Sequence, residues 1–150
     1  MSAHNILIIE ARFYEEIADN LVAGARAVIE TAGCSFERLH VPGILEIPAA
    51  ARMAVRASRE GLKTPAFIGL VVLGCAIKGE TDHYYHVCRE AISGVQGIAL
   101  EFDFPIGNGI LTCPNRTLAL QRSSISGQNF GGRAALACLR MIEVRKEFGL

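Results

Sequence analysis

The sequence has no tryptophan, no C-x-x-C pair and no block of basic residues, and each absence narrows the function. Without closely spaced cysteines, neither a zinc site of the finger type nor a dithiol redox motif is supported. The 15 Lys and Arg residues balance the 15 Asp and Glu residues. A neutral chain without a basic patch argues against nucleic acid as the main partner.

Long apolar segments are also missing. The most apolar run, residues 65–77, is too short to span a bilayer and contains two glycines, so we expect no membrane association. Residues 1–10 contain no basic region followed by a long apolar run, so we expect no signal peptide. The five cysteines are odd in number and widely spaced, which is typical of a protein in a reducing cytoplasm.

What is present is an alternation of apolar patterns. With 51% hydrophobic residues in 150, the chain is long enough for one domain, residues 1–150, with a proper core. Apolar periodicity predicts strands at 5–10, 35–41, 65–77 and 104–112, and helices at 17–32, 48–60, 84–98, 115–122 and 131–147. Such alternation predicts an α/β fold, a three-layer α/β/α sandwich with a four-stranded parallel sheet and flavodoxin-like winding. We expect Gly107-Asn108-Gly109 to interrupt the fourth strand.

The segment Lys78-Gly79-Glu80-Thr81-Asp82-His83 is the most informative one for function. It follows the buried strand at 65–77 and precedes a helix, which is where α/β folds place ligands. The backbone N–H groups of Glu80 and Thr81 at that helix start favour an anion, although Thr81 or Asp82 could equally serve as a helix cap. His83 can move protons near neutral pH, or it can be an exposed helix-start histidine. His86 lies three residues on, but nothing completes a metal site, so we expect no metal.

Three residues elsewhere are weaker candidates when each is considered alone. Glu46, among apolar residues at a helix start, can bind ligand hydroxyls or simply complement the helix dipole. Arg122 precedes a polar loop and suits a phosphate, as do many surface arginines. Phe13, after the first strand, could stack on a flat heterocycle, or pack in the core or against a loop.

Taken in order, these segments resemble the lumazine synthase family over nearly the whole chain. The resemblance rests on the elements V-P-G-x-x-E-I-P and G-E-T-x-H-Y, together with three shorter matches. The two elements lie within the matching segments Val41–Pro48 and Leu73–Tyr84. The shorter matches are Ala11-Arg12-Phe13, Gly109-Ile110-Leu111-Thr112 and the region 122–131. The combination at this spacing is highly specific.

The resemblance implies a cofactor-independent transferase of riboflavin biosynthesis. The family condenses 5-amino-6-(D-ribitylamino)uracil with 3,4-dihydroxy-2-butanone 4-phosphate to 6,7-dimethyl-8-ribityllumazine, in sites between the subunits of a homopentamer. It implies that His83 shuttles protons, and that Gly79, Glu80, Thr81 and the adjacent subunit's Arg122 bind phosphate. The other substrate-binding positions that it implies are Phe13, Gly43, Ile44, Leu45, Glu46, Ile77, Lys78 and Asn108.

The chain departs from the family pattern at four positions. Tyr14 stands where Asn is common, Leu45 and Asn108 stand where pocket aromatics are common, and Phe130 replaces a Lys. These departures leave an alternative open, a catalytically weak paralogue that acts as a flavin-precursor-binding or assembly protein. The phosphate residues and His83 favour the enzyme.

Overall fold

Strands and helices alternate throughout residues 4–150, which are the residues that the computed structural model describes. Residues 1–3, and with them the beginning of the segment in which no signal peptide is expected, lie outside the described residues. The elements are β1 (Asn5–Ala11), α1 (Glu15–Thr31), β2 (Ser35–Val41), the 3-10 helix η1 (Ile44–Glu46), α2 (Ile47–Arg59), β3 (Phe67–Ile77), α3 (His83–Phe102), β4 (Ile106–Cys113), α4 (Arg116–Ser123) and α5 (Phe130–Glu147).

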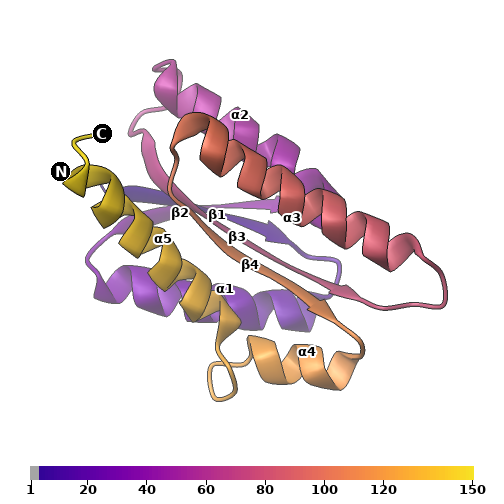
Figure 1. The fold of residues 1–150 in the computed structure, drawn as a ribbon. Helices are drawn as coiled ribbons and strands as arrows, with labels where there is room; N and C mark the ends of the chain where they lie inside the picture. Colours follow the sequence, from indigo (N-terminus) through magenta and orange to yellow (C-terminus); the bar gives the residue numbers. More distant parts are fainter. Residues whose placement is uncertain (1–3) are drawn as a thin grey trace.

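The strands form one parallel sheet in the order β2-β1-β3-β4. In Figure 1, α2 and α3 lie on one face of this sheet, and α1, α4 and α5 lie on the other. The predicted α/β fold, with three layers and flavodoxin-like winding, is therefore confirmed. From β1 the chain continues to β2 on one side and then returns to β3 on the other side of β1. Such a switch in direction leaves a crevice at the carboxyl ends of β1 and β3, which is the usual position of ligands in such sheets.

Burial along each strand follows its place in the sheet. All seven residues of the inner strand β1 are buried, and β3 is almost wholly buried, as the continuous apolar runs predict. The outer strand β2 contains no fully buried residue, which confirms the prediction of a more exposed strand. Two apolar cores result: one beneath α1 and α5 contains Leu21 and Cys138, and the other beneath α2 and α3 contains Ile47 and Val95.

The predicted interruption of the fourth strand at Gly107-Asn108-Gly109 is wrong, because β4 runs through all three residues in regular register with β3. The glycine at position 107 is needed for another reason. A Cβ atom on Gly107 would lie 1.8 Å from the backbone oxygen of Ala134. The close approach of α5 to the sheet, rather than a turn, therefore requires glycine here.

Most helix ends match the sequence within a residue or two, but α3 continues to Phe102, four residues beyond the predicted end at 98. Gly33, at φ 76°, follows α1 in the left-handed conformation that glycine adopts readily. Asn115 caps α4, with its Oδ1 accepting a hydrogen bond from Leu118 N at 2.9 Å. Asn129 caps α5 through Gly132 N at 3.2 Å, so the last helix begins at Phe130 rather than Gly131. None of the helices in residues 4–150 is long and apolar enough to cross a membrane.

Candidate active site

A pocket of about 380 Å³ opens at the carboxyl ends of β1 and β3. Three segments far apart in the sequence surround it: the turn after β1, the 3-10 helix η1, and the end of β3 with the start of α3. Its lining residues are Phe13, Tyr14, Gly43, Ile44, Leu45, Glu46, Cys75, Ala76, Ile77, Gly79, Thr81, His83, Tyr84 and Val87. The pocket thus brings together most of the residues that the sequence singles out.

Phe13 contributes an exposed aromatic ring to this pocket. Its side chain is 74% exposed, and its ring meets Tyr14 edge to face at 5.0 Å between centroids. The alternative that Phe13 packs in the core is therefore wrong. At this exposure the ring is accessible to a planar ligand.

The segment Gly43–Glu46 forms a second wall. Gly74 of β3 lets η1 approach closely, because a Cβ there would lie 2.7 Å from Ile44 Cγ2. The Oε1 atom of Glu46 accepts a hydrogen bond from Gly43 N at 2.9 Å, so this carboxylate caps the 3-10 helix. Its other oxygen, Oε2, has no hydrogen bond within residues 4–150. Capping and ligand binding are therefore compatible at Glu46.

The turn before α3 provides the polar end of the pocket. His83 is exposed and begins α3, and its backbone N–H donates to Thr81 Oγ1 at 3.3 Å. Asp82 holds the N-cap position but makes no side-chain capping bond. Of the two capping candidates, Thr81 is the one whose side chain accepts a bond from the helix start. The free N–H groups and the positive dipole end of this helix favour an anion beside His83.

Lys78 and Glu80 belong to the same turn but do not line the pocket. The backbone N–H of Lys78 donates to Cys113 O at 2.9 Å, which ties the turn to the end of β4. Its Nζ lies 5.5 Å from the centre of the Tyr85 ring. A hydrogen bond with Tyr85 raises the pKa of Lys78, so this ammonium group stays charged.

Arg122 and Asn108 lie outside the pocket of their own chain. Arg122, in the last turn of α4, directs Nη1 toward Cys113 Sγ at 3.6 Å. Asn108 is an exposed residue of β4 whose Oδ1 accepts a bond from Ile110 N at 2.9 Å. The structure therefore does not unite them with His83 within one subunit.

Sequence reasoning missed several lining residues, among them Tyr14, Cys75 and Tyr84. Burial, helped by the neighbouring thiols of Cys113 and Cys88, raises the pKa of Cys75 to about 12, so the thiol remains protonated. Burial also raises the pKa of Tyr84. Their position in the sequence is the available signal, because Tyr14 directly follows Phe13 and Tyr84 directly follows His83.

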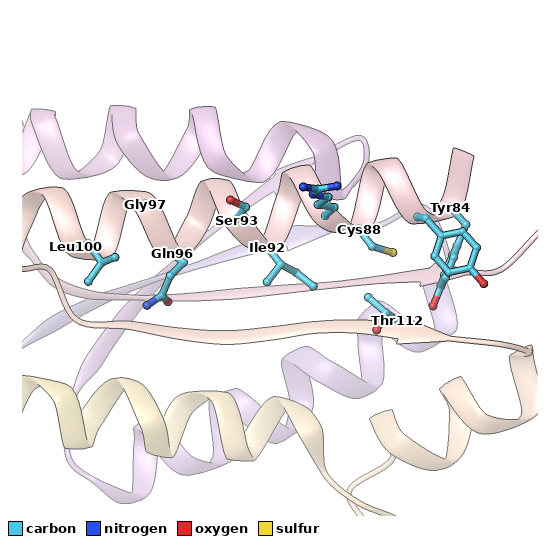
Figure 2. Close-up of a pocket in the computed structure, with 10 residues that line it drawn as sticks. Tyr84, Cys88, Ile92, Ser93, Gln96, Gly97, Leu100 and Thr112 are labelled. Carbon is cyan, nitrogen blue, oxygen red and sulfur yellow. The ribbon is translucent and has the colours of Figure 1, made fainter. Parts of the chain in front are cut away.

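A second, larger hollow of about 800 Å³ runs along α3 on the side next to the edge strand β4. Figure 2 shows Tyr84 near one end of it and Leu100 near the other, with Thr112 contributed by β4. Leu100 is 71% exposed, and Ile92 between these ends is 37% exposed. Tyr84 lines both hollows, so the groove along α3 begins at the candidate site.

Within residues 4–150, no group of three or more His, Cys, Asp or Glu side chains is placed to hold a metal ion. The chemistry that the pocket itself offers is an exposed aromatic ring, a free carboxylate oxygen, an anion-favouring helix start and an imidazole. That set suits a planar heterocycle with hydroxyl groups, next to an anionic group, with proton transfer between them.

Comparison with known proteins agrees with this chemistry. The model of a family described as 6,7-dimethyl-8-ribityllumazine synthase matches residues 3–146. A protein of that name from Paramagnetospirillum magneticum is 49% identical over 145 residues, which cover 97% of each chain. Another of the same name, from Agrobacterium fabrum, is 43% identical over 150 residues and 99% of each chain. A third, from Bartonella bacilliformis, is 43% identical over 97% of this chain and 92% of its own.

Proposed function

This chain belongs to the 6,7-dimethyl-8-ribityllumazine synthase family, and we propose on that basis that it makes 6,7-dimethyl-8-ribityllumazine in riboflavin biosynthesis. The substrates are 5-amino-6-(D-ribitylamino)uracil and 3,4-dihydroxy-2-butanone 4-phosphate. One observation carries the assignment to this pocket. Phe13, η1 and the turn before α3 surround a single hollow, with His83 at its anion-favouring end. Nothing in the comparisons favours the alternative of a non-catalytic binding protein.

The uracil occupies the part of the pocket beside Phe13. The exposed ring stacks on the pyrimidine, and Ile77 packs against its edge. The free Oε2 of Glu46 and the backbone of Gly43–Leu45 bind the hydroxyl groups of the ribityl chain. Leu45 is 51% exposed at this wall and offers an apolar contact there. The result is one planar and one polar subsite for the first substrate.

The phosphate of the second substrate binds at the start of α3. The backbone N–H groups of Gly79, Glu80 and Thr81 approach it from this subunit. Lys78 contributes by anchoring that turn to β4 through its bond to Cys113 O. Arg122 reaches the phosphate from an adjacent subunit, since it lies outside the pocket of its own chain. We assign Asn108 to the neighbouring site for the same reason.

The reaction moves a proton at each stage, and we assign these proton transfers to His83. The 5-amino group of the uracil attacks the ketone, and loss of water gives an imine. Elimination expels the phosphate, and the ribitylamino nitrogen then closes the ring with loss of a second water. A neutral imidazole accepts the proton released by the amine and returns protons to leaving oxygens. Much of the acceleration comes from holding two substrates in one geometry, for which the remote phosphate supplies binding energy.

Assembly completes the site in this proposal. We infer that residues 1–150 form a single domain that associates into a homopentamer, with sites between subunits. The groove along α3 supports this, because it exposes Leu100 and Ile92 and begins at Tyr84 beside the pocket. Self-association is the usual way to cover such a surface. The five free cysteines suit a protein of the cytoplasm.

The direct test is to incubate the protein with both substrates and follow the fluorescence of the lumazine. The two substrates also react without an enzyme, so the matched control omits only the protein. We expect product to form well above that background. Product formation at the uncatalysed rate would contradict the proposed function.

A further inference from the structure

A buried carboxylate stands at the end of β1, just before the turn that carries Phe13. Glu10 is 2% exposed, and two arginines satisfy it. Arg38 of β2 forms a fork, with Nε 2.7 Å from Oε2 and Nη2 2.8 Å from Oε1. Arg12 donates from Nη1 to Oε1 at 2.7 Å. Glu10 thus links two strands to the turn.

Burying this charge is costly, and well-packed apolar residues in place of a buried ion pair are often equally or more stabilising. Burial alone would raise the pKa of Glu10, but the hydrogen bonds and charges of Arg38 and Arg12 outweigh it, and the pKa lies below its ordinary value. The group is therefore a fully satisfied carboxylate. What the ion pair provides, and apolar residues would not, is a fixed direction for the arginine that it holds.

Arg12 uses nearly every donor of its guanidinium. Besides Glu10, its Nη2 donates to Glu15 Oε2 at 2.7 Å and also bonds to Asp19, both in the first turns of α1. Its backbone N–H donates to Val41 O at 3.4 Å, at the point where β2 leads into the wall of the pocket. One residue therefore ties together β1, β2 and α1 around the turn.

Phe13 follows Arg12 directly and lacks such support of its own. Its ring is 74% exposed, and it meets the Tyr14 ring in a T-shaped arrangement. An exposed ring that is to stack on a ligand must have its backbone held by something else. The neighbouring Arg12 supplies that hold.

We propose that Arg12, anchored by Glu10, is a positioning residue that orients Phe13 for the planar ring of the substrate. The inference rests on the proposed function and deepens it by separating the ring-binding half of the site from the phosphate-binding half. Arg12 itself does not line the pocket. Its effect is therefore confined to the ring-bearing substrate.

The first arm of the test needs no substrate. The chain has no tryptophan, so Phe13→Trp introduces a single fluorescent reporter at the turn. We expect the fluorescence anisotropy of that reporter to fall when Arg12→Gln is added, because the turn gains freedom. The control is Arg140→Gln in the same background, since Arg140 also bridges two carboxylates, Glu143 and Glu147, each at 2.9 Å, but is exposed on α5. Unchanged anisotropy with Arg12→Gln would overturn the proposal.

The second arm measures binding of the uracil substrate alone by calorimetry, and then the kinetics with both substrates. We expect Arg12→Gln to weaken uracil binding and raise its KM about tenfold, a loss within the range of aromatic stacking on a base. The KM for the phosphorylated ketone should stay within about twofold. Arg12→Lys should recover only part of the binding, because an ammonium group lacks the planar fork. A rise in both KM values, or full recovery with lysine, would contradict the proposal.

A double-mutant cycle separates positioning from general damage to the fold. If Arg12 acts through Phe13, Arg12→Gln should change uracil binding little once Phe13→Ala is present. Equal losses in both backgrounds would overturn the proposal. If the wild-type protein binds no uracil, the proposed function fails, whereas the anisotropy still reports whether Arg12 holds the turn.

Discussion

Arg122 directs its guanidinium Nη1 to the Cys113 thiol, 3.6 Å away, and does not line the pocket that contains His83. A thiol is a weak acceptor, so this contact leaves the charge of the guanidinium poorly matched. Arg122 also lies in the last turn of the short helix α4, before a polar loop. A half-buried arginine with such a partner is well suited to meet an anion from another subunit.

Replacing Arg122 with alanine should chiefly weaken binding of the phosphorylated ketone. Loss of a hydrogen bond to a charged group costs about 1.5–3 kcal/mol, so the KM for this substrate should rise roughly 10- to 150-fold. The KM for the uracil should change little. Steady-state kinetics with each substrate varied in turn measures both values, with Arg140→Ala as an exposed control. An unaltered KM for the ketone would remove Arg122 from the phosphate site.

A shared site also predicts complementation between two variants that are each impaired when the ketone concentration is at or below the wild-type KM. If His83 and Arg122 of one site come from different subunits, mixed assemblies of His83→Ala and Arg122→Ala chains contain some intact sites. Random mixing in equal amounts should restore about a quarter of the sites, because each contributing subunit is intact in half of the cases. Activity is measured after the chains are unfolded and refolded together. Mixtures no more active than the separately refolded variants would show that one subunit supplies both residues.

His83→Ala should slow turnover by about 100-fold, at the lower end of what general acid–base catalysis contributes. His83 is exposed and begins a helix, so assembly and the free energy of unfolding should change little. His86→Ala is the matched control, because His86 is an exposed histidine of the same helix that does not line the pocket. Equal turnover numbers for the two variants would count against His83 as the proton carrier.

The order of helices and strands could be predicted from the sequence, because the buried residues of each element recur with the spacing of a helix or a strand. The continuous apolar runs of β1 and β3 identify inner parallel strands, and Gly33 and Asn115 identify helix ends. The error at Gly107 has a physical cause. A glycine required by close helix packing looks the same in a sequence as a glycine required by a turn, and only the position of α5 distinguishes them.

The candidate site could be predicted only in part. Phe13, Glu46 and His83 were found because each follows a strand end or begins a helix, and parallel strands bring such positions to one edge of the sheet. Lys78 shows the limit, because the same turn sends its side chain to Tyr85 and not into the pocket. The direction of a side chain depends on its packed neighbours, and these are not adjacent in the sequence.

The close packing of β4 against α5 predicts a large effect of a single methyl group. In Gly107→Ala the new Cβ would lie 1.8 Å from Ala134 O, and neither backbone can move without shifting an element. We expect the free energy of unfolding to fall by about 3 kcal/mol, at the upper end of typical overpacking. Gly97→Ala is the control, because a Cβ there has no neighbour within 4 Å inside the chain. Removing a helical glycine should raise stability by about 0.5–1 kcal/mol. Similar denaturation midpoints for both variants would contradict this account of β4.

The buried carboxylate of Glu10 should make stability depend on pH in the acid range. Its pKa in the folded protein lies below the ordinary value of 4.5, since Arg38 and Arg12 outweigh the effect of burial. At a pH between the two values, the unfolded chain binds the proton and the folded chain does not. The stabilisation is therefore fully present above 4.5 and is lost as the pH falls through the lower, folded-state value.

The pH dependence of stability in the wild type is compared with that of Glu10→Gln. Both proteins contain all the other carboxylates, so the difference between them reports the contribution of Glu10 alone. The amide cannot ionise, and it leaves Arg12 and Arg38 without their buried countercharge. At neutral pH the variant should be less stable by about 1–3 kcal/mol, the usual cost of unpairing a buried polar group. Urea unfolding between about pH 7 and pH 3 measures the difference, which should shrink on acidification, because the wild-type carboxyl becomes neutral as well. A difference that stays constant with pH would mean that the charge of Glu10 contributes nothing, and that packing alone holds the end of β1.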